Sequence, residues 1–163
     1  MSIVRLNHAV LHVRDLDRSL AFYRDLMGFR VLPGTPRALR FRAAFLQAPG
    51  STNDHDLALF ELGPDAGAVT EGTVGLVHLA WEVDTLAELE RLAGVLQAAG
   101  AFVRSSDHGA TKSVYGRDPD GIEFEVTWMV PRLYWGEWAN HGVVRPLDLD
   151  LELQRWGRPV ARA

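Results

Sequence analysis

With 163 residues, of which 47% are hydrophobic and 23% charged, the chain predicts a single globular domain over residues 1–163. Charges of both signs are mixed, the net charge is −4, and no window is long and apolar enough to span a membrane, so we expect neither a nucleic-acid nor a membrane partner. The absence of cysteine excludes disulfides and thiolate metal sites and leaves His, Asp and Glu as the strong metal ligands.

The chain starts with MSIVRLNHAV, which has one arginine and no long apolar run. This stretch does not predict a signal peptide, and we therefore expect a cytoplasmic protein.

Residues 4–63 follow the order strand, helix and three further strands. The first strand begins near Leu6 and has His8 as its third residue, and Asp15 or Asp17 can cap the helix that follows. Apolar residues then recur at helical spacing up to Gly28, which is suited to the left-handed conformation that ends a helix. Three strand-like runs complete the pattern: FRVL, LRFRAAFLQA and DLALFEL.

Residues 74–130 repeat this order after a soft connection over residues 63–75. His78 is the third residue of the opening strand, Asp84 or Thr85 can cap the helix, and Gly100 can end it. The strand-like runs are AFVRSS, TKSVYGRD and EFEVTW, with a Pro-Asp-Gly turn at residues 119–121 before the last of them.

The repeat predicts an α+β fold of two βαβββ modules, residues 4–63 and 74–130. Two such modules can pair their sheets into an open, curved half-barrel with the helices outside. Residues 131–163 match neither module and predict an aromatic-rich turn and one helix around residues 147–156. Their composition leaves open whether this extension is a lid or part of a dimer interface.

Residues two apart in a strand share a face, which predicts where polar side chains gather. Glu125 falls on the polar face of its strand, and His55, Leu57, Leu59 and Glu61 fall on one face of theirs. A lone strand histidine is more often structural than a ligand. His8 and His78 nevertheless occupy matching positions of the repeat, and we expect the same of Glu61 and Glu125. The pattern therefore predicts that up to two imidazoles and two carboxylates converge.

The segments LNHAVLHVRDLDRSLAFYRDLMGF, GLVHLAWEV and DPDGIEFEV together resemble the vicinal oxygen chelate superfamily. This superfamily includes glyoxalase I, the fosfomycin and bleomycin resistance proteins and the extradiol ring-cleaving dioxygenases. The resemblance covers roughly residues 4–130 and implies the glyoxalase/bleomycin resistance/dihydroxybiphenyl dioxygenase fold around a metal cleft. It also implies that His8, His78 and Glu125 are metal ligands, because Glu125 stands four residues after the glycine of the family's closing turn.

Two further segments resemble the extradiol dioxygenases in particular, and most of all their single-pair, catechol 2,3-dioxygenase-like members. HDLALF places His55 at their acid–base histidine, and DHGATKSVYGRDPDG places His108 and Tyr115 at a second histidine and a tyrosine of their active site. The resemblance implies an Fe(II)-dependent enzyme that cleaves a catechol-like small aromatic diol with O₂. In that reading His55 transfers protons, and Tyr115 and His108 contact a substrate oxygen.

Glu61 keeps a second reading open, because it resembles a ligand of glyoxalase I. A fourth protein ligand would suit Zn(II) or Ni(II) and a glyoxalase- or epimerase-like lyase or isomerase, and Mn(II) is a further candidate metal. A third reading is a small-molecule-binding drug-resistance protein without a metal. Superfamily membership also implies a homodimer.

Overall fold

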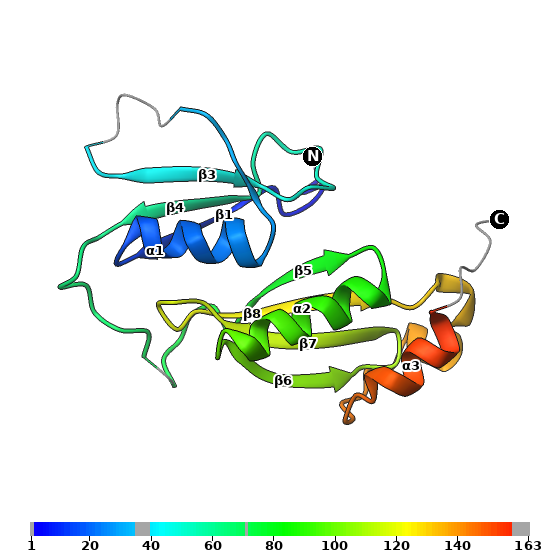
Figure 1. Ribbon diagram of the computed structural model, residues 1–163. Coiled ribbons are helices and arrows are strands. Elements are labelled where there is room, and N and C mark those ends of the chain that lie inside the picture. Colours follow the sequence, from blue (N-terminus) through cyan, green and yellow to red (C-terminus); the bar gives the residue numbers. More distant parts are fainter. Residues whose placement is uncertain (1, 35–39, 71, 158–163) are drawn as a thin grey trace. The chain divides into compact units, whose positions relative to one another are not determined.

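The computed structural model describes residues 2–34, 40–70 and 72–157 (Figure 1). Three of the predicted segments extend beyond the described residues. These are the run LRFRAAFLQA at Leu39, the connection over residues 63–75 at Glu71, and the extension 131–163 at residues 158–163. The chain divides into two compact units: Met1–Glu71 with Pro119–Gly121, and Gly72–Asp118 with Ile122–Ala163. None of the described helices combines the length and apolar character needed to cross a membrane.

The first unit contains one four-stranded sheet with the strand order β1-β4-β3-β2. β1 pairs with β4 in parallel, and the other two pairings are antiparallel. A helical segment on one side of this sheet connects β1 to β2 (Figure 1). The elements of the first unit, in chain order, are β1 (Ala9–Val13), α1 (Leu16–Leu20), η1 (Ala21–Leu26), β2 (Arg30–Val31), β3 (Ala43–Gln47) and β4 (Leu57–Glu61).

Local signals explain the helical segment of the first unit. The side chain of Asp15 accepts a hydrogen bond from Arg18 N and so caps α1, as one of the two expected caps. The segment continues as one π-helical turn, η1, and ends at Gly28, where a φ of +80° requires a residue without a side chain. Phe22 and Tyr23 of this segment and Phe29 after it are buried, and the Tyr23 ring meets the other two rings edge to face.

The turn Pro119–Gly121 belongs to the first unit although most of its sequence neighbours do not. The Asp120 carboxylate accepts hydrogen bonds from Arg14 N at 3.0 Å and from the Arg18 guanidinium at 2.6 Å. Its side chain is only 6% exposed, so these donors replace the water that the carboxylate loses.

The second unit repeats the topology of the first, with the strand order β5-β8-β7-β6 and a parallel β5–β8 pair. Thr85, one of the two expected caps, accepts a hydrogen bond from Glu88 N, and Gly100 follows the helix with a φ of +67°. The helix lies on one side of the sheet (Figure 1), and its Leu86, Leu89, Leu92 and Leu96 are buried. The elements are β5 (Leu79–Val83), α2 (Leu86–Ala98), β6 (Phe102–Asp107), β7 (Thr111–Arg117) and β8 (Glu123–Met129).

β8 shows the alternation that its sequence predicts. Phe124, Val126 and Trp128 are buried, whereas Glu123 and Glu125 are partly exposed on the other face. The α+β class, with two four-stranded sheets that remain open, is therefore confirmed.

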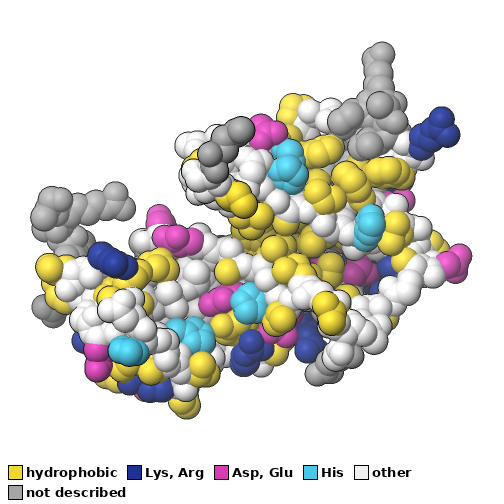
Figure 2. Space-filling view, turned by 180° about the vertical axis from the view of Figure 1, so that it is seen from behind, with side chains coloured by type: hydrophobic (Ala, Val, Ile, Leu, Met, Phe, Trp, Pro, Cys, Tyr) yellow, Lys and Arg dark blue, Asp and Glu magenta, His cyan; other side chains and the backbone are white. Residues whose placement is uncertain are grey.

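After β8 the chain forms two short 3₁₀ turns, η2 (Arg132–Tyr134) and η3 (Gly136–Ala139), and the helix α3 (Leu149–Trp156). α3 confirms the helix expected around residues 147–156 and is capped by the side chain of Asp148. It packs near α2 at one end of the second unit (Figure 1). In the view of Figure 2, basic and acidic side chains are interspersed over the surface.

Candidate functional site

His78 and Glu125 face each other on neighbouring strands of the second unit. His78 immediately precedes β5, and the register pairs Ala80 of β5 with Glu125 of β8. The two side chains therefore extend from the same face of the sheet, with His78 Nε2 3.1 Å from Glu125 Oε2. Their exposed fractions are 30% and 12%, so both groups are partly desolvated and still reachable from solvent.

This pair fits a divalent metal ion by its donor types and by its spacing. Two ligand atoms each about 2.1 Å from one ion, at a right angle to each other, would be about 3.0 Å apart. The observed separation of 3.1 Å agrees with that value. His78 Nδ1 is buried without a hydrogen-bond partner among the described residues, so Nε2 is the atom through which this imidazole interacts.

Tyr115 lies beside this pair and is joined to His108. It is opposite Glu125 in the β7–β8 register, and its hydroxyl is 3.0 Å from His108 Nε2. His108 Nδ1 donates to the Val143 carbonyl oxygen at 2.8 Å, because a carbonyl can only accept. In neutral His108 the Nε2 atom is then the acceptor, and Tyr115 donates its proton to it.

The surroundings of Tyr115 keep its hydroxyl protonated. Burial raises the pKa of Tyr115 above its ordinary value, and the negative charge of Glu125 raises it further. The Arg104 guanidinium lies 3.7 Å from the centre of the Tyr115 ring and opposes this shift in the pKa. The net effect is a raised pKa, so the phenol acts as a hydrogen-bond donor at neutral pH.

Arg104 is a neighbour of this site that sequence reasoning missed. It pairs with Tyr115 across β6 and β7, next to a register irregularity, and binds Glu123 at 2.7 Å. The only signal in the sequence is that AFVRSS forms an edge strand. Which of its residues faces Tyr115 depends on the irregularity, which spacing alone does not reveal.

In the first unit, the structure brings together His8 and His55. Their ring centres are 4.3 Å apart, and the Phe45 ring meets His55 edge to face at 5.1 Å. His8 Nδ1 donates to Asn7 Oδ1 at 2.8 Å, which leaves the lone pair of Nε2 available to a metal. His55 Nδ1 lies 2.8 Å from Asp54 Oδ2, which likewise directs its Nε2 atom away from that carboxylate.

The loop before β4 is held in place by Asp56. This carboxylate accepts hydrogen bonds from Ala48 N at 2.8 Å and from the side chains of Ser51 and Asn53 at 2.7 Å. The neighbouring His55 side chain is 15% exposed. Because these hydrogen bonds of Asp56 order the loop, the adjacent His55 is held in a defined position.

The strand register corrects the expectation that Glu61 matches Glu125. Glu125 is opposite Ala80, two residues after His78, but the residue opposite Val10, two after His8, is Ala58. Glu61 is three residues further along β4.

The register places Leu57, Leu59 and Glu61 on one face of β4, as expected, because they pair with Ala9, Leu11 and Val13. Leu57 and Leu59 are fully buried and pair with Ala9 and Leu11, so this set alternates with the exposed Val10. Leu57 and Leu59 therefore form part of the core of the first unit. The Glu61 carboxylate accepts from Leu16 N at 2.8 Å, at the start of α1, and binds the Arg42 guanidinium at 2.9 Å.

Within residues 2–34, 40–70 and 72–157, no group of three or more His, Asp or Glu side chains is close enough to hold a metal. The first unit therefore offers the His8–His55 pair, and the second offers His78 with Glu125 and Tyr115 with His108.

Comparison with known proteins agrees with this arrangement of elements. The chain is 34% identical over 131 residues to a catechol-2,3-dioxygenase of Bacillus subtilis, covering 80% of this chain and 43% of that protein. It is 36% identical over 126 residues to a biphenyl-2,3-diol 1,2-dioxygenase of Rhodococcus globerulus, covering 75% of this chain and 62% of that protein. The chain thus spans less than two thirds of either dioxygenase. Lactoylglutathione lyases are also among its relatives.

A solved structure shares the fold. A crystal structure of a glyoxylase/bleomycin resistance protein/dioxygenase domain from Frankia matches with a TM-score of 0.68 and 27% identity, covering 80% of this chain and 96% of that one. The sequence matches the profile of the Glyoxalase/Bleomycin resistance protein/Dioxygenase superfamily over residues 5–126. The chain therefore belongs to the glyoxalase/bleomycin resistance protein/dioxygenase superfamily, also called the vicinal oxygen chelate superfamily.

Proposed function

We propose that this chain is a metal-dependent extradiol-type dioxygenase that cleaves a catechol-like aromatic diol with O₂. The observation that carries the proposal is the pairing of His78 with Glu125 next to the hydrogen-bonded Tyr115 and His108. A lyase of the glyoxalase type has no evident use for the second pair. The similarity to two ring-cleaving dioxygenases supports the same reaction class.

In this proposal His8, His78 and Glu125 are the metal ligands, and Fe(II) is the metal we expect. Two histidines and one carboxylate leave positions open on the ion, so the bound metal would supply a meeting point for the diol and dioxygen. The Nε2 lone pair of His8 and the close approach of His78 to Glu125 support this ligand set. The expected assembly is a cytoplasmic homodimer.

The other residues of the proposal hold the substrate and move protons. Tyr115 keeps its proton at neutral pH and donates it to His108, and it would turn this single O–H toward a substrate oxygen when the diol binds. His55 would accept a proton from the diol and return one during ring opening, a role suited to imidazole near neutral pH. Phe45, against the ring of His55, gives that region an aromatic surface for an aromatic substrate.

A glyoxalase- or epimerase-like lyase or isomerase is the second candidate, because lactoylglutathione lyases are among the relatives. This reading requires Glu61 to bind the metal as a fourth ligand. The contacts of Glu61 argue against it, since its carboxylate is already bound by Leu16 N and Arg42. A metal-free drug-binding protein would have no use for three ligand-type side chains.

The experiment that tests the proposal is anaerobic purification with metal analysis, then Fe(II) loading and oxygen uptake with a panel of catechols. We expect about one iron per chain and one O₂ consumed per diol, with a coloured ring-opened product. Bound zinc or nickel together with no oxygen uptake from any catechol would favour the lyase reading. Absence of any bound metal would favour a binding protein.

Two variants separate the proposed roles. His55→Ala should retain iron but lower turnover by about 100-fold or more, because it removes the proton-transfer group. Glu125→Gln should lose iron, because an amide is a weaker ligand than a carboxylate. His12→Ala serves as the matched control, because His12 lies on β1, the strand that follows His8, and has no role in the proposal. This variant should change neither the iron content nor the turnover. Loss of iron from His55→Ala would contradict the role given to His55.

A further inference from the structure

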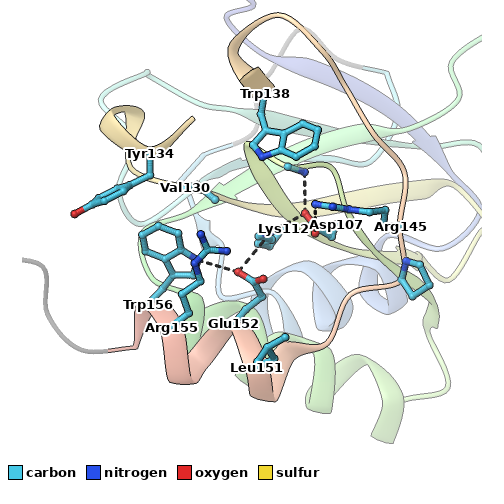
Figure 3. Close-up of a pocket in the computed structure, with 12 residues that line it drawn as sticks. Asp107, Lys112, Val130, Tyr134, Trp138, Arg145, Leu151, Glu152, Arg155 and Trp156 are labelled. Carbon is cyan, nitrogen blue, oxygen red and sulfur yellow. Dashed lines mark hydrogen bonds and ion pairs between the residues drawn. The ribbon is translucent and has the colours of Figure 1, made fainter. Parts of the chain in front are cut away.

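The second unit contains a pocket of about 480 Å³ formed where the C-terminal extension covers the β6–β7 hairpin (Figure 3). Its volume is in the range of small-molecule sites. One side is made by strand residues, among them Asp107 and Lys112, and the other by η2, η3 and α3. No residue of the proposed catalytic set lines it.

The pocket lies on the opposite face of β7 from the proposed catalytic residues. Lys112 pairs with Trp128, whereas Tyr115 pairs with Glu125, and residues an odd number apart in a strand extend to opposite faces. A molecule in the pocket would therefore be separated from Tyr115 by the sheet itself.

The floor of the pocket is a closed polar network. Lys112 Nζ, with its side chain 4% exposed, lies 2.6 Å from Asp107 Oδ1 and 3.5 Å from Glu152 Oε2. Asp107 also binds Arg145 at 2.9 Å and Gly109 N at 2.8 Å. Burial tends to raise the pKa of Asp107, but these hydrogen bonds and positive charges lower it overall, so Asp107 stays ionised.

The walls of the pocket are aromatic. The Trp138 ring covers Gly109 so closely that a Cβ atom at Gly109 would lie 2.7 Å from it. Trp156 donates its indole N–H to Glu152 at 2.8 Å, and the Tyr134 ring meets it at 5.0 Å. In Figure 3 the Trp138 ring lies above Lys112 and the Trp156 ring lies to its left, with Tyr134 further out. Such surfaces favour a flat aromatic ligand.

The charges that line the pocket do not cancel. Lys112, Arg145 and Arg155 supply three positive charges, and Asp107 and Glu152 supply two negative ones, which leaves one positive charge. Lys112 and Arg145 are paired with carboxylates. The Arg155 guanidinium lies 4.8 Å from the Trp156 ring, and no carboxylate among the described residues pairs with it. It is the cation available to an anionic ligand.

We propose that this pocket is a second small-molecule site, which binds an aromatic carboxylate with its ring between the tryptophans and its carboxylate on Arg155. The ligand class follows from the aromatic walls and the single surplus positive charge. This proposal does not depend on the proposed ring-cleaving reaction, and it stands even if the chain catalyses another reaction.

The test uses benzoate as the probe, with benzyl alcohol as its uncharged counterpart. Titration is followed through the five tryptophan indole N–H signals in a ¹H–¹⁵N correlation spectrum, assigned by single Trp→Phe variants. We expect benzoate to shift the Trp138 and Trp156 signals with a millimolar Kd and to leave Trp81 unmoved. Benzyl alcohol should bind about tenfold more weakly, because it lacks the charge. No shift at about 10 mM benzoate, or equal binding of the two probes, would overturn the proposal.

Three variants locate the binding. Arg155→Gln should weaken benzoate about fivefold to tenfold, because it removes the available cation from an exposed position without disturbing the core. Arg132→Gln is the matched control, since Arg132 also stacks on a tryptophan, Trp135, but lies outside the pocket. Glu125→Gln should leave benzoate binding unchanged. Weakening by Glu125→Gln, or none by Arg155→Gln, would mean that benzoate binds elsewhere and that the pocket is not its site.

Discussion

Tyr115 shows how much the chemistry of one side chain depends on its neighbours. Burial and Glu125 raise the pKa of its phenol, whereas Arg104, stacked on its ring, works in the opposite direction. His108 accepts its proton in a hydrogen bond of 3.0 Å. Arg104 therefore limits how far the pKa of Tyr115 is raised. The pKa of this phenol matters if it binds an ionisable diol.

Arg104→Gln should raise the pKa of Tyr115 further, and Glu125→Gln should lower it, because each variant removes one of the two opposing charges. The measurement is a spectrophotometric titration of phenolate, with Tyr115→Phe subtracted to remove the signals of Tyr23 and Tyr134. Arg117→Gln is the control, because Arg117 also pairs with Glu123 but does not stack on Tyr115. An unchanged titration in Arg104→Gln would contradict the role given to Arg104.

The raised pKa also has a consequence for stability. Because the folded state holds the Tyr115 proton more tightly than the unfolded state, this stabilisation is fully present below the unfolded pKa of about 10. It is lost as the pH rises through the folded value.

At the scale of elements, β4 and α1 are connected through Glu61. This carboxylate at the end of β4 binds the first free amide of α1 and also the Arg42 guanidinium. α1 has only five residues before the π turn, so few of its amides have partners within the helix. Glu61 therefore contributes to the helix start in the way that a capping side chain does.

Glu61→Ala should lower the free energy of unfolding by about 1–2 kcal/mol, because it removes a capping hydrogen bond and a favourable charge near the helix N-terminus. Glu61→Gln should cost less, since the amide oxygen can still accept from Leu16 N. Chemical denaturation measures both. Arg42→Gln is the comparison, with an expected loss below about 1 kcal/mol because Arg42 is half exposed. If Glu61→Gln instead lost bound metal and kept its stability, the four-ligand reading would be correct.

The element scale also shows where sequence patterns are reliable. Period-2 alternation identified the buried face of β8, because Phe124, Val126 and Trp128 alternate with polar residues. In β4, Leu57 and Leu59 alternate with Ala58 and Phe60, so the first four positions are all apolar and the pattern does not say which face is inside. Glu61 was matched with Glu125 without this information, and only the pairing with β1 shows that Ala58 stands at the matching position.

At the scale of the whole molecule, metal binding should stabilise the folded chain, because folding holds proposed ligands such as His78 and Glu125 side by side and the unfolded chain does not. Saturating Fe(II) at about 100 times its Kd would add about 2.7 kcal/mol, which corresponds to a rise in Tm of about 5–10 °C for a chain of this size. Anaerobic differential scanning calorimetry with and without a chelator measures this. Glu125→Gln should show little change in Tm, and an equal rise in that variant would place the metal elsewhere.

The repeat made most of the fold predictable from the sequence. Strands and helices recur with His8 and His78 in the same places, and the helix ends follow from Asp15, Thr85, Gly28 and Gly100. The family segment named Tyr115 and His108 as candidate site residues, but it did not predict the hydrogen bond between them. Arg104 and the pocket under α3 were not predictable, because both depend on contacts between segments that no local pattern relates.

β7 is a single seven-residue strand whose two faces carry different chemistry. Thr111, Ser113 and Tyr115 point one way, and Lys112, Val114 and Gly116 point the other. Point mutations can therefore change either face while preserving the other, so the two can diverge separately during evolution. A one-residue deletion within the strand would exchange the faces over part of its length and damage both at once. Among natural variants of this chain, we therefore expect gaps in an alignment to fall outside β7.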